Sequence, residues 1–219
     1  MRKMMIITGC LALGLLLNGC GPAQSELVIG SKHFTESKIL AEMAALMIET
    51  HTGLSVYRRL GLQGTKVCFG ALREGDLDMY PEYTGTGLVN ILQAEYKASM
   101  TTEDVYDLVQ KGFAEKWNLQ WMQPLGFNNT YAYAVRGEFA EEKGVAAISD
   151  LEEYSADMVA GFDHEYTTRP EYKRFDHVYG FTFGKVIKLD PDLTYKALQD
   201  ERVDVIDAFA TDGRIEAYG

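Results

Sequence analysis

The sequence predicts an α/β fold whose sheets are largely parallel. Short apolar runs of strand length alternate with longer amphipathic stretches along the chain, and strands separated by helices favour parallel pairing. Two of the amphipathic stretches are followed by a glycine, the usual residue just after a helix. One helix–turn–strand unit also recurs in the second half of the chain, which is typical of two lobes built on one plan.

The first half of the chain begins with a strand and a long helix. From Thr35 onward, Ile39, Met43, Leu46 and Met47 recur at helical spacing on one face, which predicts an amphipathic helix that ends before a glycine. The other elements expected in this half are strands at 27–29, 54–60 and 77–80 and helices at 65–74 and 87–93.

The second half opens with a helix over 101–117, in which Val105, Leu108, Val109 and Phe113 form one stripe. Residues 149–152 read Ser-Asp-Leu-Glu, a capping box that predicts the start of a helix at this point. The remaining strands are expected at 131–135, 158–162, 186–189 and 203–209.

The first twenty residues predict export. Two basic residues precede the apolar run Met4–Leu17, which has signal-peptide length and is too short to span a bilayer comfortably. The run ends in Leu-Asn-Gly-Cys at 17–20, which resembles a bacterial lipobox. We therefore expect a signal peptide over 1–19, a lipid on Cys20 that anchors the chain to the membrane, and a tether over 20–25. The alternative is an ordinary secretory signal with an accidental cysteine.

Composition excludes one class of partner and one kind of cross-link. The formal net charge is −11, without basic clusters, so nucleic acid is not expected as a partner. Cys10 lies in the predicted signal and Cys20 is the predicted lipid site, so Cys68 stands alone. A lone cysteine forms no internal disulfide, and the fold is expected to be held by its apolar core.

The recurring unit aligns Ala71–Asp78 with Ala197–Asp204 without gaps. Both segments read as a helix end, a turn, an apolar strand and an aspartate, and the same offset places Tyr83 over Phe209. Each lobe would then present an aromatic residue at the carboxyl end of a strand, the edge where open α/β sheets bind ligands. The alternative is a coincidence between two common units.

The segment Asp78–Gly87 carries the strongest chemical signal. Tyr80 and Tyr83 flank Pro81, and two glycines follow at the start of a predicted helix. A helix start suits an anion and an aromatic face suits a methylated cation, so the segment favours a zwitterion that carries both. The alternative is a structural turn with core tyrosines.

Five segments together resemble the osmoprotectant-binding proteins of ABC importers, which take up glycine betaine, choline or carnitine. They are Ile29–Ser37, Gly64–Thr65, Tyr80–Gly87, Leu125–Tyr131 and Val203–Arg214. The resemblance implies a type II periplasmic-binding fold, in which two lobes close on the ligand. It also implies that ABC permease and ATPase subunits are the partners and that the protein is a monomer without a cofactor.

The resemblance also implies the residues of the binding site. Tyr83 and Tyr131 match aromatic cage positions, and Phe209 stands where many members have tyrosine. Arg169 matches the arginine that holds a ligand carboxylate. The positions that match the pocket rim are Lys32, Thr86, Asn129 and Glu165.

Several of these side chains also have a purely structural interpretation. In this alternative, Arg169 and Lys32 are solvated charges on the surface, and Asn129 caps a turn. Tyr133 alternates with alanines and is expected in the core rather than in the ligand wall.

Enzyme and metal chemistry have little support in the sequence. No nucleophile elbow, phosphate-loop lysine motif or Cys-x-x-Cys is present. The acidic residues Asp76, Asp78 and Glu82 do not follow a calcium-loop pattern and are interpreted as turn and surface residues. The set His164, Glu165, Asp176 and His177 lacks the spacing of a zinc site.

The expected organisation is lobe 1 over 26–127, lobe 2 over 128–208 and a crossover back to lobe 1 over 209–219. In that architecture the chain returns to complete the first lobe, so a C-terminal segment is expected to be missing and lobe 1 is expected to expose apolar surface. Two functional alternatives stay open: a site for another methylated zwitterion, such as a betaine of histidine type, and a surface sensor or interaction module that no longer binds a ligand.

Overall fold

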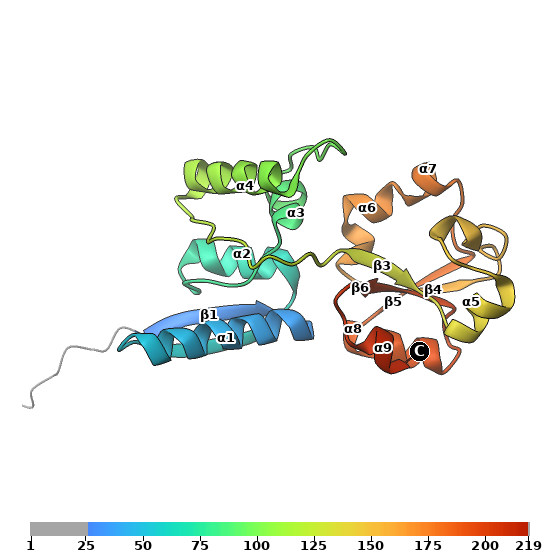
Figure 1. Cartoon of the computed structure of the whole chain (residues 1–219), viewed down its shortest axis with the longest axis horizontal. Coiled ribbons are helices and arrows are strands. Elements are labelled where there is room, and N and C mark those ends of the chain that lie inside the picture. The colour runs from blue at the N-terminus through green and yellow to red at the C-terminus, as the bar shows by residue number, and fades with distance from the viewer. Residues whose placement is uncertain (1–25, 219) are drawn as a thin grey trace, which may run out of the picture.

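The computed structural model describes residues 26–218, which form two groups of elements (Figure 1). The predicted signal peptide, Cys20 and the tether lie outside the described residues. The first group holds a parallel two-stranded sheet, β1 with β2, and the second a four-stranded sheet in the order β3-β6-β4-β5. The strands are β1 (Glu26–Lys32), β2 (Ser55–Leu62), β3 (Tyr131–Ala134), β4 (Val159–Asp163), β5 (Lys185–Leu189) and β6 (Val205–Phe209).

Helices and helical turns surround both sheets. In the first group they are α1 (Thr35–His51), α2 (Gly64–Glu74), α3 (Thr84–Thr86), the π-helical turn η1 (Gly87–Ile91) and α4 (Thr102–Trp117). In the second group they are α5 (Gly137–Lys143), η2 (Ile148–Leu151), η3 (Tyr166–Thr168), α6 (Pro170–Lys173), α7 (Phe175–Tyr179), α8 (Pro191–Gln199) and α9 (Arg214–Tyr218).

Parallel pairing dominates, as the sequence predicts. β1 with β2, β4 with β5 and β4 with β6 are parallel, and β3 is antiparallel to β6. β3 follows the long extended segment that runs from α4 into the second group (Figure 1). Its antiparallel ladder places Tyr131 directly opposite Phe209, so residues 78 positions apart in the sequence become neighbours at one end of the sheet.

The recurring unit found in the sequence is also a recurring structure. Gly75 and Glu201, which occupy the same place in the two copies, both adopt positive φ, +80° and +56°. The aspartate at the end of each copy then makes the same pair of bonds to a neighbouring strand. Asp78 accepts the Val28 N–H through its carboxylate at 2.7 Å and donates its own N–H to Val28 O at 2.8 Å. Asp204 makes the corresponding two bonds to Val159, both at 2.8 Å.

The unit therefore places residues 77–79 beside β1 in the way that β6 lies beside β4. The predicted strand at 77–80 is nevertheless wrong, because only Met79 forms a bridge to Ile29 and Gly30 donates to Met79 O at 2.9 Å. Pro81 follows at once and has no N–H to continue a ladder.

The predicted helix start at Ser149 is wrong as well. Residues Ile148–Leu151 form a single 3₁₀ turn, and Asp150 rather than Ser149 accepts the free N–H groups of Ala146 and Ala147, at 2.9 and 2.8 Å. A carboxylate in this position closes a short turn in the way that a cap closes a helix.

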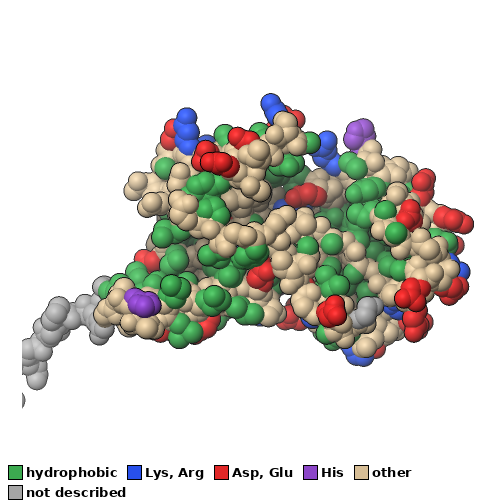
Figure 2. All heavy atoms as spheres, viewed as in Figure 1, with side chains coloured by type: hydrophobic (Ala, Val, Ile, Leu, Met, Phe, Trp, Pro, Cys, Tyr) green, Lys and Arg blue, Asp and Glu red, His purple; other side chains and the backbone are tan. Residues whose placement is uncertain are grey.

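Helix α1 packs on its sheet through small residues. Ala41 and Ala45 are fully buried with Ile29 and Val56, whereas the larger apolar side chains that predicted the helix point away from the sheet. Each of these is more than half exposed: Ile39, Met43, Leu46 and Met47. The first group accordingly shows apolar side chains on its surface (Figure 2).

Larger cores form elsewhere. The second group packs Phe162, Tyr166, Phe175 and Phe183 into one aromatic cluster, and α4 packs Val109 and its neighbours against η1. Among the described residues no helix is both long and apolar enough to cross a membrane, and the thiol of Cys68 is free and buried.

Candidate ligand-binding site

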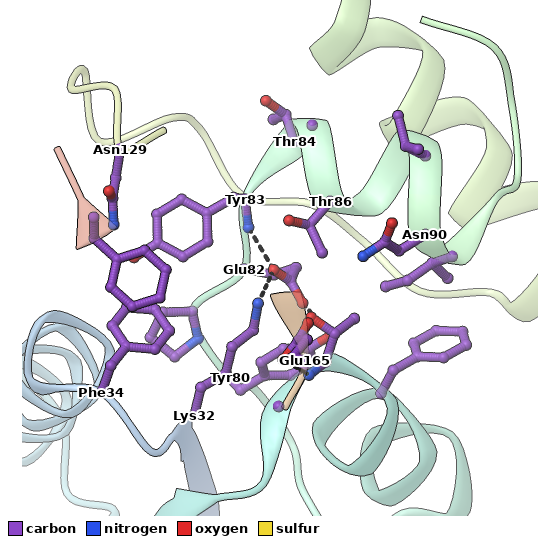
Figure 3. Close-up of a pocket in the computed structure, with 18 of the residues that line it drawn as sticks. Lys32, Phe34, Tyr80, Glu82, Tyr83, Thr84, Thr86, Asn90, Asn129 and Glu165 are labelled. Atoms are coloured by element: carbon purple, nitrogen blue, oxygen red, sulfur yellow. Dashed lines mark hydrogen bonds and ion pairs between the residues drawn. The ribbon is translucent and has the colours of Figure 1, made fainter. Parts of the chain in front are cut away.

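A hollow between the two groups is lined by side chains from both of them (Figure 3). Every residue that the sequence proposes for the site lines this hollow. The residues are Lys32, Tyr83, Thr86, Asn129, Tyr131, Glu165, Arg169 and Phe209.

Five aromatic rings form a continuous row across the hollow, which we call the aromatic row. Its ring centroids are separated by 6.1 Å between Tyr83 and Phe34, 4.7 Å between Phe34 and Phe209, 5.1 Å between Phe209 and Tyr131, and 4.7 Å between Tyr131 and Tyr166. The β3–β6 pairing brings Tyr131 against Phe209, and the turn before α1 brings Phe34 to both groups. Such faces are the surface that a methylated cation needs.

The tyrosine hydroxyls of the row stay protonated near neutral pH. Burial, together with the neighbouring Glu36 carboxylate, raises the pKa of Tyr83. Burial also raises the pKa of Tyr131, and it raises the pKa of Tyr166 to about 12. The row therefore contributes neutral π faces and neutral donors.

Phe34 and Tyr166 were missed by reasoning from the sequence. Phe34 lies inside the Ile29–Ser37 motif and Tyr166 follows Glu165 directly, so proximity to recognised positions was the available signal. Tyr133 lies where the sequence places it, in the core, where it packs on Phe162 and shares a 2.7 Å hydrogen bond with the Tyr166 hydroxyl.

Lys32 and Glu82 form a buried ion pair beside the row. Lys32 Nζ lies 2.6 Å from Glu82 Oε1, and each side chain is only 5% exposed (Figure 3). Glu82 also accepts the Tyr83 N–H at 2.8 Å and the Tyr80 hydroxyl at 3.1 Å. The interpretation of Glu82 as a surface residue is therefore wrong, and so is the alternative that Lys32 is solvated. A buried carboxylate requires such donors, and the turn around Pro81 supplies them.

Arg169 is buried as well, so the alternative of a surface charge is wrong. Its side chain is 6% exposed and its guanidinium lies 4.8 Å from the centre of the Tyr131 ring. It donates to Thr86 at 3.4 Å and to Glu171 at 2.7 Å, and Glu165 lies at 3.9 Å. Its Nε is buried without a partner among the described residues.

Glu165 joins the two groups across the hollow. It accepts the Thr65 N–H at 3.3 Å, and a Cβ at Gly64, which has φ +63°, would overlap its carboxylate. Glycine at 64 therefore gives the carboxylate access to the start of α2.

Glu36 is a further residue that the sequence did not single out. From the first turn of α1 it accepts hydrogen bonds from the Tyr83 hydroxyl, from Asn129 Nδ2 at 2.9 Å and from the Thr211 hydroxyl at 2.5 Å. Asn129 precedes β3 and Thr211 follows β6, so this carboxylate of the first group contacts the segment that enters the second group and the turn that leaves its strand β6. Asn129 thus binds Glu36 instead of serving only as a turn cap.

Two buried carboxylates, Asp163 at the end of β4 and Asp207 within β6, lie next to each other. Asp207 Oδ1 accepts the Asp163 N–H at 2.8 Å. Burial and the nearby Asp163 carboxylate raise the pKa of Asp207 to about 7. Within residues 26–218 no group of three or more His, Cys, Asp or Glu side chains is arranged to hold a metal ion.

Comparison with known proteins decides the family. The sequence model described as "Substrate binding domain of ABC-type glycine betaine transport system" matches residues 25–219. The chain belongs to this family. Because ABC-type substrate-binding domains serve transport, the chain is the substrate-binding component of an ABC transporter, as its resemblance to osmoprotectant-binding proteins implies.

Curated members of the family agree. The chain is 33% identical over 217 residues to the "Carnitine transport binding protein OpuCC" of Listeria monocytogenes, covering 95% of this chain and 70% of that protein. It is 31% identical to the "Glycine betaine-binding protein YehZ" of Escherichia coli K12, covering 90% and 68%. It is 32% identical to the "Ergothioneine transport permease/ergothioneine binding protein EgtU" of Helicobacter pylori G27, covering 88% of this chain and 34% of that longer protein.

Solved structures confirm the α/β periplasmic-binding fold. A structure titled as a glycine betaine/carnitine/choline ABC transporter is 31% identical, with a TM-score of 0.65, and covers 89% of this chain and 72% of that one. Apo YehZ is also 31% identical, with a TM-score of 0.59, and covers 89% and 73%.

Proposed function

We propose that this protein captures a small quaternary-ammonium compound, such as glycine betaine, choline or carnitine, and delivers it to an ABC permease with its ATPase. The observation that supports this most directly is the aromatic row, whose rings come from both groups of elements. A trimethylammonium head lying against Tyr83, Phe209 and Tyr131 exchanges water for apolar contact while π faces and carboxylates balance its charge.

In this proposal the polar residues bind the rest of the ligand or position the aromatic side chains. Arg169, with Thr86 beside it, holds a ligand carboxylate where one is present, and Asn129 and Glu165 form the rim. Lys32 acts through its ion pair with Glu82, which fixes the backbone of Tyr83. None of these groups is an activated nucleophile, so binding without chemistry is the proposed activity.

The wider arrangement also belongs to the proposal. Residues 26–127 and 128–208 act as the two lobes, with 209–219 crossing back. Cys20 carries a lipid that anchors a monomeric protein outside the cytoplasmic membrane, after removal of residues 1–19.

Titration calorimetry with matched methylated and unmethylated compounds tests the proposal. Glycine betaine, choline and carnitine are expected to bind and glycine is not, because a primary ammonium keeps its hydration and fits a wide aromatic surface poorly. Equal affinity for glycine and glycine betaine would contradict the role of the aromatic row.

One alternative has a specific observation in its favour. The H. pylori relative is named for ergothioneine, a betaine of histidine type, so ergothioneine and histidine form a second matched pair in the same panel. Preference for ergothioneine over choline and glycine betaine would favour this alternative, and absence of binding by every compound would favour a surface sensor or interaction module.

A further inference from the structure

Both cations at the aromatic row already have a carboxylate partner. Lys32 Nζ lies 5.3 Å from the centre of the Tyr83 ring and 2.6 Å from Glu82. Arg169 stacks on Tyr131 at 4.8 Å, and its Nη2 donates to Glu171 Oε1 at 2.7 Å. The protein itself therefore partly neutralises the positive groups that a ligand carboxylate would seek.

Two further carboxylates add negative charge around the row. Glu165 Oε1 lies 3.9 Å from Arg169 Nη1. Glu36 binds three neutral donors, of which Tyr83 is one, and forms no ion pair among the described residues. The surroundings of the row thus contain more glutamates than cations, and a site with such a balance favours a ligand with net positive charge.

Glu171 is the most exposed of these carboxylates. It lies in α6, two residues beyond Arg169, and its side chain is 45% exposed. The Arg169 side chain, in contrast, is 6% exposed and its Nε has no partner among the described residues. A ligand carboxylate that reaches this guanidinium finds its charge partly neutralised by Glu171 and is repelled by that carboxylate, whereas a cation without a carboxylate meets no such competition.

We propose that Glu171 sets the specificity of the site: it competes with ligand carboxylates for Arg169, so that a trimethylammonium alcohol binds more tightly than a trimethylammonium carboxylate. This inference rests on the proposed function and adds to it a preference between two classes of ligand. Because Glu171 is half exposed, its competition is moderate in size, and zwitterions still bind.

Calorimetry with choline and glycine betaine on the unaltered protein and on Glu171→Gln tests the inference. The unaltered protein is expected to prefer choline. Glu171→Gln keeps the size of the side chain but removes its charge, so the ratio of the two dissociation constants is expected to shift about tenfold toward glycine betaine, the scale of one charge-assisted hydrogen bond. Glu138→Gln removes an exposed charge from α5 and is expected to leave the ratio unchanged.

The outcomes separate this inference from the proposed function. If the unaltered protein binds both compounds and prefers glycine betaine, or if Glu171→Gln changes both affinities by the same factor, the role of Glu171 is overturned and the proposed function stands. If neither compound binds to either protein, both are overturned. Glu171→Ala repeats the test with a side chain that cannot hydrogen-bond to Arg169, and the same direction of shift is expected.

Discussion

Lys32 and Glu82 form a 2.6 Å ion pair that is almost completely buried and that also binds the backbone N–H of Tyr83. Two residues fifty positions apart thereby fix the start of the segment that leads into α3. Removal of one charge from such a pair leaves the other without compensation, which is more harmful than removal of both.

Lys32→Met is therefore expected to lower the free energy of unfolding by about 3–5 kcal/mol. The double variant Lys32→Met, Glu82→Gln is expected to be more stable than the single one, because glutamine still accepts the Tyr83 N–H and carries no charge. Urea unfolding at pH 7 measures both, and Lys66→Met, at an exposed position, is the control. A double variant less stable than Lys32→Met would contradict this explanation.

Tyr83→Ala and Tyr131→Ala are each expected to weaken the binding of a quaternary ammonium compound by roughly 1–2 kcal/mol, the scale of a desolvated cation–π contact. Calorimetry with choline measures the change. Tyr57→Ala truncates a tyrosine that is exposed on β2 and is expected to bind choline like the unaltered protein. A loss of the same size in Tyr57→Ala would show that the effect comes from stability rather than from the aromatic row.

Glu36→Gln is expected to weaken choline binding about tenfold, since an amide accepts fewer of the three hydrogen bonds and removes a charge beside Tyr83. The matched control is Glu103→Gln, which changes an exposed glutamate in the first turn of α4. Binding is measured together with the thermal midpoint, so that a loss of affinity without a loss of stability identifies a positioning role. Unchanged affinity in Glu36→Gln would refute it.

Asp207 predicts a pH dependence of stability. Its pKa is about 7 in the folded protein and about 4 in an unfolded chain, so between these values the folded state holds a proton that the unfolded state releases. The contribution of Asp207 to stability is therefore complete below about pH 4 and is lost as the pH rises to about 7.

Asp207→Asn removes this titration while its carbonyl still accepts the Asp163 N–H. Thermal midpoints at pH 5 and pH 8 are expected to lie closer together in Asp207→Asn than in the unaltered protein. Asp157→Asn, at an exposed position, is expected to leave the difference unchanged. If the midpoints at pH 5 and pH 8 differ as much in Asp207→Asn as in the unaltered protein, other groups determine the pH dependence.

A new charge is expected to affect stability very differently on the two faces of α1. Met47 is 62% exposed, so Met47→Lys is expected to change the free energy of unfolding by no more than about 0.5 kcal/mol. It is also expected to reduce self-association, because it interrupts an exposed apolar face. Ala45→Lys would bury a charge against the sheet and is expected to prevent folding. Light scattering and urea unfolding check the pair, and severe destabilisation by Met47→Lys would contradict the exposure of this face.

Much of the fold follows from local patterns in the sequence. The repeat of Ala71–Asp78 in Ala197–Asp204 predicted a shared unit, and the structure shows the same turn and the same aspartate bonds in both copies. Helical spacing identified α1, but it did not show which face of the helix is buried. The small side chains of Ala41 and Ala45 allow close packing on the sheet, and the larger apolar side chains of the stripe stay exposed.

The site is less accessible to such patterns because its contacts join distant segments. Glu36 binds Asn129 and Thr211, which lie 93 and 175 positions away, and no periodicity reports a contact of that kind. Glu82 was interpreted as a turn or surface residue together with Asp76 and Asp78, whereas its burial depends on the ion pair with Lys32. The aromatic positions were identified through family motifs, and their roles in binding stay predictions.

The neutral partners of Glu36 have a consequence for work in concentrated electrolyte. Ion pairs between exposed groups weaken as dissolved ions screen them, over a Debye length of about 8 Å at physiological ionic strength and about 3 Å at 1 M. Glu36 instead binds a phenol, an amide and an alcohol, and short hydrogen bonds to uncharged donors depend little on that screening. The contact that ties α1 to the segment before β3 and to the turn after β6 is therefore expected to persist when the surrounding medium becomes saline.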